Sequence, residues 1–243
     1  GGYIIAAQTS SYGNGDIDAC LIKVDSSGEE EWMKTYGGKN VDRIFSVQQT
    51  PDGGFIGAGI TYSFNSVSPN DRDGYFIKTE ASGKLEWYKT FGEDLYDVLH
   101  SVALTNDDGY FFTGYGESYA ESGYRDVYLL NTDNMGNTNW LKVVGTPGEE
   151  RGIKGVQTID GGYIAVGITS EQRDLYLIRL DNRGELLWTR NLGDQKTIEF
   201  GYTVRETRDG GFILTGHQQS FTNDLRNIIL IKTDSRGQVT DKE

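Results

Sequence analysis

The chain has 243 residues, and its 36 acidic against 23 basic side chains give a formal net charge of −13. This charge excludes nucleic-acid binding through a basic face, because phosphate contacts need clustered lysine and arginine. No apolar run approaches the roughly 18 residues of a membrane span, so we expect no membrane insertion of this segment. The single cysteine, Cys20, excludes a disulfide within the chain and is expected to be a small buried side chain.

The first element that recurs along the chain is a glycine-rich turn followed by an apolar strand. The turn is found at Gly1-Gly2, Asp52-Gly53-Gly54, Asp107-Asp108-Gly109, Asp160-Gly161-Gly162 and Asp209-Gly210-Gly211. The strands that follow read YIIAA, FIGAG, YFFTG, YIAVG and FILTG. Glycine supplies the positive φ angles of tight hairpin turns, so each copy predicts a hairpin into a buried strand.

A second β-rich run then follows an acidic or amide residue, which is Asp18, Asp73, Asp126, Asp174 or Asn227. The runs read ACLIKVD, GYFIKTE, VYLLNTD, LYLIRLD and IILIKTD, and each leads to a turn glycine. Four residues after that glycine stands a tryptophan in four copies: Trp32, Trp87, Trp140 and Trp188. The fifth copy has Asp241 at this place. The turn and the tryptophan together predict a hairpin into a further strand.

A strand of alternating pattern precedes each Asp-Gly-Gly turn and completes the unit: SVQQT, SVALT, GVQTI and TVRET. Tryptophan spacings of 55, 53 and 48 residues suit a four-stranded blade. We therefore predict an all-β fold, a β-propeller of about five four-stranded antiparallel blades. It would form a single domain over 1–243, with repeat units of about 1–45, 46–100, 101–154, 155–202 and 203–243. The first unit lacks its first strand and the fifth stops where its fourth would begin, so we expect part of a longer chain.

The repeated pattern D-x-x-L-I-K-x-D-x-x-G-x-x-x-W-x-K-T-x-G-G, followed by S-V-x-x-T-x-D-G-G, resembles the β-propeller repeat proteins of bacterial and archaeal cell surfaces. The nearest class is the secreted "seven-bladed β-propeller repeat" proteins, which implies an extracellular or cell-surface location. The D-x-x-G-x-x-x-W segment is also similar to the tryptophan-docking motif of quinoprotein propellers and, more loosely, to the Asp-box of sialidases. In those families the motif packs blades together, so the resemblance implies a structural role for the four tryptophans and no quinone or sialic acid chemistry.

The loops after the second strand vary in length and content, and they read SSYGNGD, TYSFNSVSPNDRD, GESYAESGYRD, TSEQRD and QQSFTNDLRN. Loops on a rigid scaffold commonly carry binding residues, so this face is the candidate binding face. A serine followed by an aromatic residue recurs there, with the aromatic at Tyr12, Phe64, Tyr119 and Phe221, whereas the fourth copy has Ser170-Glu171. These rings are either platforms for sugar rings or packing groups against the neighbouring blade.

Acidic residues recur five positions before a first-strand valine, at Asp42, Asp97 and Glu199. In the fourth copy Arg151 takes this position, with Glu149 and Glu150 beside it. Three interpretations remain open: a structural cap between blades, a site for a divalent cation such as calcium, or an acid–base pair of a glycoside hydrolase near the channel mouth.

The sequence lacks the residue clusters that a histidine-based metal site would need. The two histidines, His100 and His217, are in different copies and have no neighbouring cysteine or acid cluster. We expect no organic cofactor. The sequence thus favours a non-catalytic binding or scaffold module that recognises a glycan or a cell-surface protein through its loops. The alternatives are a glycoside hydrolase with channel-mouth carboxylates and a purely structural spacer.

Overall fold

The computed structural model describes residues 1–64, 71–93, 95–120, 124–170, 173–193, 197–222 and 225–242. These residues form strands and turns and contain no helix, hence none that is long and apolar enough to cross a membrane. The strands form five antiparallel sheets, one for each repeat, with three strands in the first sheet and four in the others. The predicted fold class, an all-β propeller of five blades, is confirmed.

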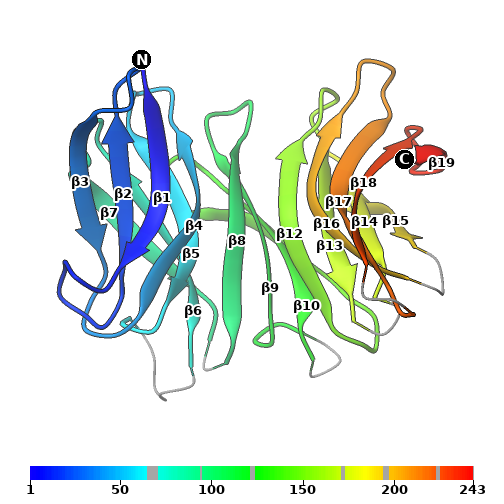
Figure 1. Ribbon diagram of the computed structural model, residues 1–243, viewed down its shortest axis with the longest axis horizontal. Coiled ribbons are helices and arrows are strands. Elements are labelled where there is room, and N and C mark those ends of the chain that lie inside the picture. The colour runs from blue at the N-terminus through cyan, green and yellow to red at the C-terminus, as the bar shows by residue number, and fades with distance from the viewer. Residues whose placement is uncertain are drawn as a thin grey trace. The chain divides into compact units, whose positions relative to one another are not determined.

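The chain divides into two compact units, Gly1–Leu104 with Gly116–Tyr119, and Thr105–Tyr115 with Ala120–Glu243. The strands of the first unit, blue to green in Figure 1, are β1 (Tyr3–Thr9), β2 (Asp18–Val24), β3 (Glu30–Tyr36), β4 (Asp42–Gln49), β5 (Phe55–Thr61), β6 (Asp73–Thr79), β7 (Leu85–Phe91) and β8 (Asp97–Leu104). We name β1–β3 blade 1 and β4–β7 blade 2, and β8 begins blade 3. Successive strands of blades 1 and 2 pair antiparallel.

The strands of the second unit, green to red in Figure 1, are β9 (Tyr110–Gly116), β10 (Asp126–Thr132), β11 (Thr138–Val144), β12 (Glu150–Gln157), β13 (Tyr163–Thr169), β14 (Leu175–Leu180), β15 (Leu186–Leu192), β16 (Thr197–Glu206), β17 (Phe212–Ser220), β18 (Arg226–Thr233) and β19 (Val239–Lys242). Strands β9–β11 belong to blade 3, β12–β15 are blade 4 and β16–β19 are blade 5. The contact between two consecutive blades is called a joint below.

The second and third strands of a blade form its core. Strands β5 and β6 are buried along their whole length, whereas the outer strand β7 exposes about half of its side chains. This explains why FIGAG and GYFIK read as continuous apolar runs, since each face of these strands is covered by neighbouring side chains. Apolar residues of blades 1 and 2 form one cluster, which includes Leu21, Ile44 and Ile77. Similar clusters join blades 3 and 4 and blades 4 and 5, so these blades complete their cores on a neighbouring blade.

The repeated tryptophans close these joints. A Cβ added to the turn glycine of the following blade would lie 2.8 Å from Trp32 at Gly83, 2.6 Å from Trp140 at Gly184 and 2.7 Å from Trp188 at Gly237. The same indoles make edge contacts with an aromatic residue of that blade, with ring centroids 5.8 Å apart for Trp32–Phe55, 5.2 Å for Trp140–Tyr163 and 6.0 Å for Trp188–Phe212. Trp87 contacts Phe76 of its own blade at 6.1 Å. A glycine is needed beneath the indole because no side chain fits there.

A buried cation on the third strand fixes the Asp-Gly-Gly turn within three of the blades. Lys78 donates to Asp52 at 2.8 Å and to Glu86 at 2.9 Å. Arg179 and Asp160 form the same ion pair in blade 4, as do Lys232 and Asp209 in blade 5. The turn aspartate also accepts the N–H of the second glycine, as Asp52 does from Gly54 at 2.9 Å. The recurring acid of the turn thus has a structural partner on a strand.

Strand boundaries differ from the sequence prediction in three places. Strand β4 starts at Asp42 rather than Ser46, because a bulge between Ile44 and Ser46 interrupts the alternation that the sequence pattern follows. In the fourth copy Glu150, not Arg151, opposes Thr169 as Asp42 opposes Thr61, because Gly155, and not Val156, stands at the place of Val47. The fifth copy also forms a short fourth strand, β19, which pairs with β18.

The contact between the tryptophan and the turn glycine predicts that replacing two glycines of blade 4 by alanine lowers the free energy of unfolding by different amounts. Gly184 and Gly161 have nearly the same φ, 81° and 82°, but only Gly184 lies beneath an indole. We expect Gly161→Ala to cost about 1 kcal/mol from backbone strain alone. Gly184→Ala should cost about 1–3 kcal/mol more, because the methyl group displaces Trp140. Urea unfolding of both variants measures the difference, and equal costs would show that the indole contributes nothing to the joint.

The Lys78 ion pair predicts a pH dependence of stability. Hydrogen bonds from Lys78 and Thr50 hold the pKa of Asp52 at about 2. A carboxyl whose folded pKa is lowered stabilises the fold above its ordinary value of about 4, and this contribution is lost as the pH falls toward about 2. Urea unfolding at about pH 6 should therefore find Asp52→Asn less stable than the parent, with the gap closing by about pH 2. The control is Asp107→Asn, because Asn131 replaces the cation in that blade; a closing gap of the same size there would contradict the assignment.

Candidate functional site

The four recurring acids lie inside the joints. Asp42, Asp97 and Glu199 are 0% exposed and Glu150 is 1% exposed. The backbone N–H of each acid donates to a carbonyl just before the third strand of the preceding blade. These bonds are Asp42 to Ile17 at 2.7 Å, Asp97 to Arg72 at 2.8 Å, Glu150 to Arg125 at 2.7 Å and Glu199 to Arg173 at 2.9 Å. The acid therefore marks the point where one blade is attached to the one before it.

The Asp42 carboxylate shows how such an acid is satisfied. Ser63 Oγ donates to Oδ2 at 2.6 Å, the Thr61 hydroxyl donates to Oδ1, and the Gly38 N–H donates to Oδ2 at 2.8 Å. Gly38 belongs to the loop after blade 1, while the two hydroxyls belong to blade 2. A carboxylate that accepts three such bonds ties a loop of one blade to the strand end of the next.

The other three acids also accept hydrogen bonds, from Thr146 of the loop after blade 3 in one case and from the blade of the acid itself in the other two. The Ser118 hydroxyl donates to Asp97. Thr146 donates both its N–H, at 2.8 Å, and its hydroxyl, at 2.6 Å, to Glu150. Thr197 Oγ1 donates to Glu199 at 2.6 Å. Among the described residues, no group of three or more histidine, cysteine, aspartate or glutamate side chains is arranged to hold a metal ion.

The serine of the Ser-aromatic motif belongs to the same hydrogen-bond network. We call this network the clasp: the buried acid, its donors and the loop that enters the first strand. The hydroxyl oxygens of Ser63, Ser118 and Ser170 accept backbone N–H groups of the loop that enters the first strand: Asn40 at 3.0 Å, Glu93 at 3.0 Å and Glu149 at 3.1 Å. Ser63 and Ser118 also donate to the buried acid of the joint. The recurrence of this serine thus has a structural cause in every one of these joints.

The aromatic residues of the motif divide into two groups. Phe64 stacks on Tyr88 with ring centroids 4.5 Å apart, and Tyr119 contacts Phe91 at 5.5 Å. Tyr12 is 64% exposed and Phe221 is 52% exposed. The first two rings pack their loops onto strands, and the second two present a face to solvent. Glu171, which replaces the aromatic in the fourth copy, lies outside the described residues.

A pocket of about 320 Å³ lies at the joint between blades 3 and 4, on the variable loops. It is lined by Tyr124, Pro147, Gly148, Glu149 and Ser170. Tyr124 is 62% exposed and forms an aromatic wall, and the Glu149 carboxylate lies among polar groups. Arg125 and Arg151 donate to Oε1 of Glu149 at 3.1 and 2.7 Å, and Oε2 accepts no hydrogen bond from the described part of the chain.

The environment of Glu149 fixes its charge. Burial disfavours the ionised carboxylate, but the hydrogen bond and charge of Arg151 and the charge of Arg125 outweigh burial and lower its pKa. Glu149 is therefore an anion at neutral pH, able to accept hydrogen bonds and not to supply a proton. Arg151, which follows the acid of the fourth copy as Arg43 follows Asp42, acts as the partner of Glu149.

The sequence pattern missed Tyr124 and the arginines of this face. An arginine stands immediately before the acid or amide of the third strand in four copies, as Arg72, Arg125, Arg173 and Arg226. In the second blade Arg72 lies 3.1 Å from the centroid of the Tyr96 ring. The Arg-Asp and Arg-Asn dipeptides were a visible signal for these cations. Tyr124 had no such signal, because the residue before the arginine is Asp71, Gln172 or Leu225 in the other copies and does not recur.

No family model and no curated protein sequence matches the chain. Among solved structures, the chain is similar to a puromycin hydrolase, with a TM-score of 0.54, 12% identity, and coverage of 98% of this chain and 36% of that one. A structure of BBS1N in complex with ARL6DN gives 0.48 at 11% identity, covering 98% and 65%, and a GH43 β-1,3-galactosidase gives 0.46 at 9%, covering 93% and 85%. The chain thus spans about a third of the hydrolase chain, and the likeness at this identity concerns the fold.

The clasp predicts that the motif serine stabilises the fold in those blades where its hydroxyl donates to the buried acid. Ser63→Ala removes a donor to Asp42 and an acceptor for Asn40, so it should lower the free energy of unfolding by about 1–3 kcal/mol. The matched control is Ser11→Ala, the same motif position in blade 1, whose hydroxyl bonds to none of the described residues. Urea unfolding should find the control unchanged, and a similar loss in both variants would argue against the clasp.

Proposed function

We propose that this protein is a non-catalytic binding module that recognises a saccharide through the variable loops at its blade joints. The observation that carries the proposal is the pocket around Tyr124, whose lining combines an exposed aromatic residue, an ionised carboxylate and a serine. The buried acids, by contrast, are engaged in holding the blades together. Binding is therefore assigned to the loops and not to the recurring carboxylates.

The pocket offers the two kinds of contact that a sugar ring needs. The face of Tyr124 supplies apolar surface for the C–H groups of the ring, and the tyrosine body is rigid enough to present it with little loss of entropy. Oε2 of Glu149 accepts hydrogen bonds from hydroxyl groups, and a bond to a charged acceptor is stronger than a neutral one. A volume of about 320 Å³ suits one or two sugar rings.

The same geometry argues against the glycoside hydrolase alternative. Hydrolysis needs two carboxyl groups about 5–9.5 Å apart, one of which must hold a proton at neutral pH. Asp42, Asp97, Glu150 and Glu199 are buried and accept bonds from their own joints. The lowered pKa of Glu149 removes it as a proton donor. A structural spacer is the less favoured reading because a spacer does not require Tyr124 to be exposed.

Repetition gives the proposal its mode of action. Tyr12 and Phe221 are exposed on the corresponding loops of other blades, and the proposal extends to weak sites built on these rings. Weak sites on one chain raise the overall affinity for a repeating ligand without a single tight pocket. Repeating ligands of this kind are glycans of a cell surface or matrix, and an extracellular or cell-surface location is part of the proposal. A cell-surface protein that bears such glycans is the natural partner.

A binding experiment tests the Tyr124 pocket. Tyr124→Ala should weaken binding to the best ligand of a glycan array at least about tenfold, which corresponds to about 1.4 kcal/mol. Glu149→Gln should weaken it to a smaller extent, because the amide still accepts one hydrogen bond. Tyr3→Ala is the control, since Tyr3 is equally exposed but lies on β1 away from the variable loops.

Two outcomes would overturn the proposal. The first is an array without a saccharide ligand combined with capture of an unglycosylated surface protein, since the loops would then recognise polypeptide. The second is release of product from the bound glycan that Glu149→Gln abolishes, since the site would then be catalytic. Asp97→Asn is not a clean test of catalysis, because Asp97 is buried and bonded to Ser118.

A further inference from the structure

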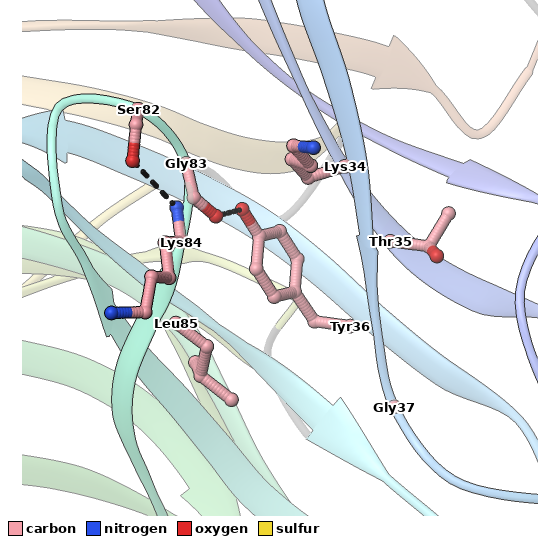
Figure 2. Close-up of a pocket in the computed structure, with 8 residues that line it drawn as sticks. All are labelled: Lys34, Thr35, Tyr36, Gly37, Ser82, Gly83, Lys84 and Leu85. Atoms are coloured by element: carbon pink, nitrogen blue, oxygen red, sulfur yellow. Dashed lines mark hydrogen bonds between the residues drawn. The ribbon is translucent and has the colours of Figure 1, made fainter.

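A second pocket, of about 530 Å³, lies at the joint between blades 1 and 2 on the outer strand. Its lining is the end of β3 and the turn before β7: Lys34, Thr35, Tyr36, Gly37, Ser82, Gly83, Lys84 and Leu85. Figure 2 shows Tyr36 bridging the two parts, with its hydroxyl donating to the Gly83 carbonyl at 2.6 Å. The Tyr36 ring lies between Lys34 on one side and Lys84 on the other.

The repeat permits a comparison with another joint of the chain. The residue two places after the tryptophan is Lys34 in blade 1 and Lys142 in blade 3. The residue after the turn glycine of the following blade is Lys84 in blade 2 and Glu185 in blade 4. Lys142 and Glu185 form an ion pair at 2.9 Å. At the joint of blades 1 and 2 these positions therefore hold two cations, whereas the position after the turn glycine is Glu185 at the joint of blades 3 and 4 and an amide, Asn137 or Gln238, at the remaining two joints.

The stem of Lys34 is held at the joint. A Cβ added to Gly83 would lie 2.9 Å from its Cγ, just as a Cβ at Gly237 would lie 3.0 Å from Cγ of Arg190 in blade 4. No ion pair of Lys34 is found in the part of the chain that the structure describes. Lys84 contacts Glu80 at 3.3 Å, but with the two side chains 75% and 45% exposed the pair is worth little.

We propose that this pocket binds an oxyanion, a sulfate, phosphate or carboxylate that is either free or carried by a larger molecule. The anion takes the place that the Glu185 carboxylate has at the joint of blades 3 and 4, between the ammonium groups of Lys34 and Lys84. A lysine ammonium on a flexible stem reaches such a ligand as a point charge, so the two side chains can close on it from both sides of Tyr36. The site is independent of the saccharide pocket, which lies in the other unit of the chain.

The charges around the pocket determine its affinity for an anion. The chain carries 13 more negative than positive charges, which repels anions at long range. Attraction therefore comes from the two ammonium groups at short range, against the nearby Glu80 carboxylate. Binding should be of the order of millimolar and should weaken as salt screens the charges.

The test is a titration of the whole chain with sodium sulfate, followed by NMR on backbone amides at constant ionic strength set with sodium chloride. We expect saturable shifts at Thr35, Gly83 and Lys84. Lys84→Glu recreates the Lys–Glu pair of the other joint, so it should weaken sulfate binding at least about tenfold. Lys34→Gln should weaken it as well. Lys39→Glu, an exposed loop residue outside the pocket, makes the same change in net charge and should leave binding unaltered.

The same titration distinguishes the sources of the anion. Glucuronate that binds more tightly than sulfate, with glucose inactive, assigns the site to an acidic sugar, whereas sulfate or phosphate as the better ligand assigns it to a free anion or an ester of one. Shifts that do not saturate, or that persist unchanged in Lys84→Glu, would overturn the proposal. A loss of binding in Lys39→Glu equal to that in Lys84→Glu would also overturn it, since net charge alone would then explain the effect.

Discussion

The structure depends on the contact between one blade and the next. The middle strands of a blade are buried on both faces, as β5 and β6 show. A single blade would therefore expose apolar side chains to water, and the neighbouring blade covers them. Two kinds of contact, at opposite ends of the joint, hold the two blades together. At one end an indole lies over a turn glycine, and at the other a buried acid attaches its strand to the preceding blade. Both kinds of contact recur because consecutive blades have to keep their apolar faces together.

The joint explains which parts of the sequence predict the fold. Several residues recur in register because the joint needs them, such as Gly83 beneath Trp32 and Ser63 beside Asp42, and others, such as Asp52 of the turn, because they hold their own blade. The number of blades, their strand order and the structural place of the tryptophans could therefore be predicted from recurrence alone. The starts of the first strands could not, because the bulge between Ile44 and Ser46 breaks the two-residue period on which strand prediction depends.

The same reasoning explains why the candidate site was only partly predictable. Of the four motif aromatics, Phe64 and Tyr119 recur because their loops need packing, and a sequence alone does not separate them from the exposed Tyr12 and Phe221. Tyr124 is a residue that the joint does not require, so recurrence gave no indication of it. In a repeat protein, departures from the pattern are the better guide to function, and Lys84 is a departure of this kind because the same position is Glu29, Asn137, Glu185 or Gln238 in the other copies.

The buried carboxylates also change how the charge of the chain is understood. A formal count places all 36 acids in one field, which favours cation binding at clustered carboxylates. Yet Asp42, Asp97, Glu150 and Glu199 accept hydrogen bonds from hydroxyl and N–H groups within their joints. A cation would have to displace these donors, two of which, Gly38 and Thr146, come from the loop after the preceding blade, so its binding would oppose the fold that builds the site. Ligands of this protein should therefore approach residues that the joints leave exposed, and those include cations such as Lys34 as well as rings such as Tyr124.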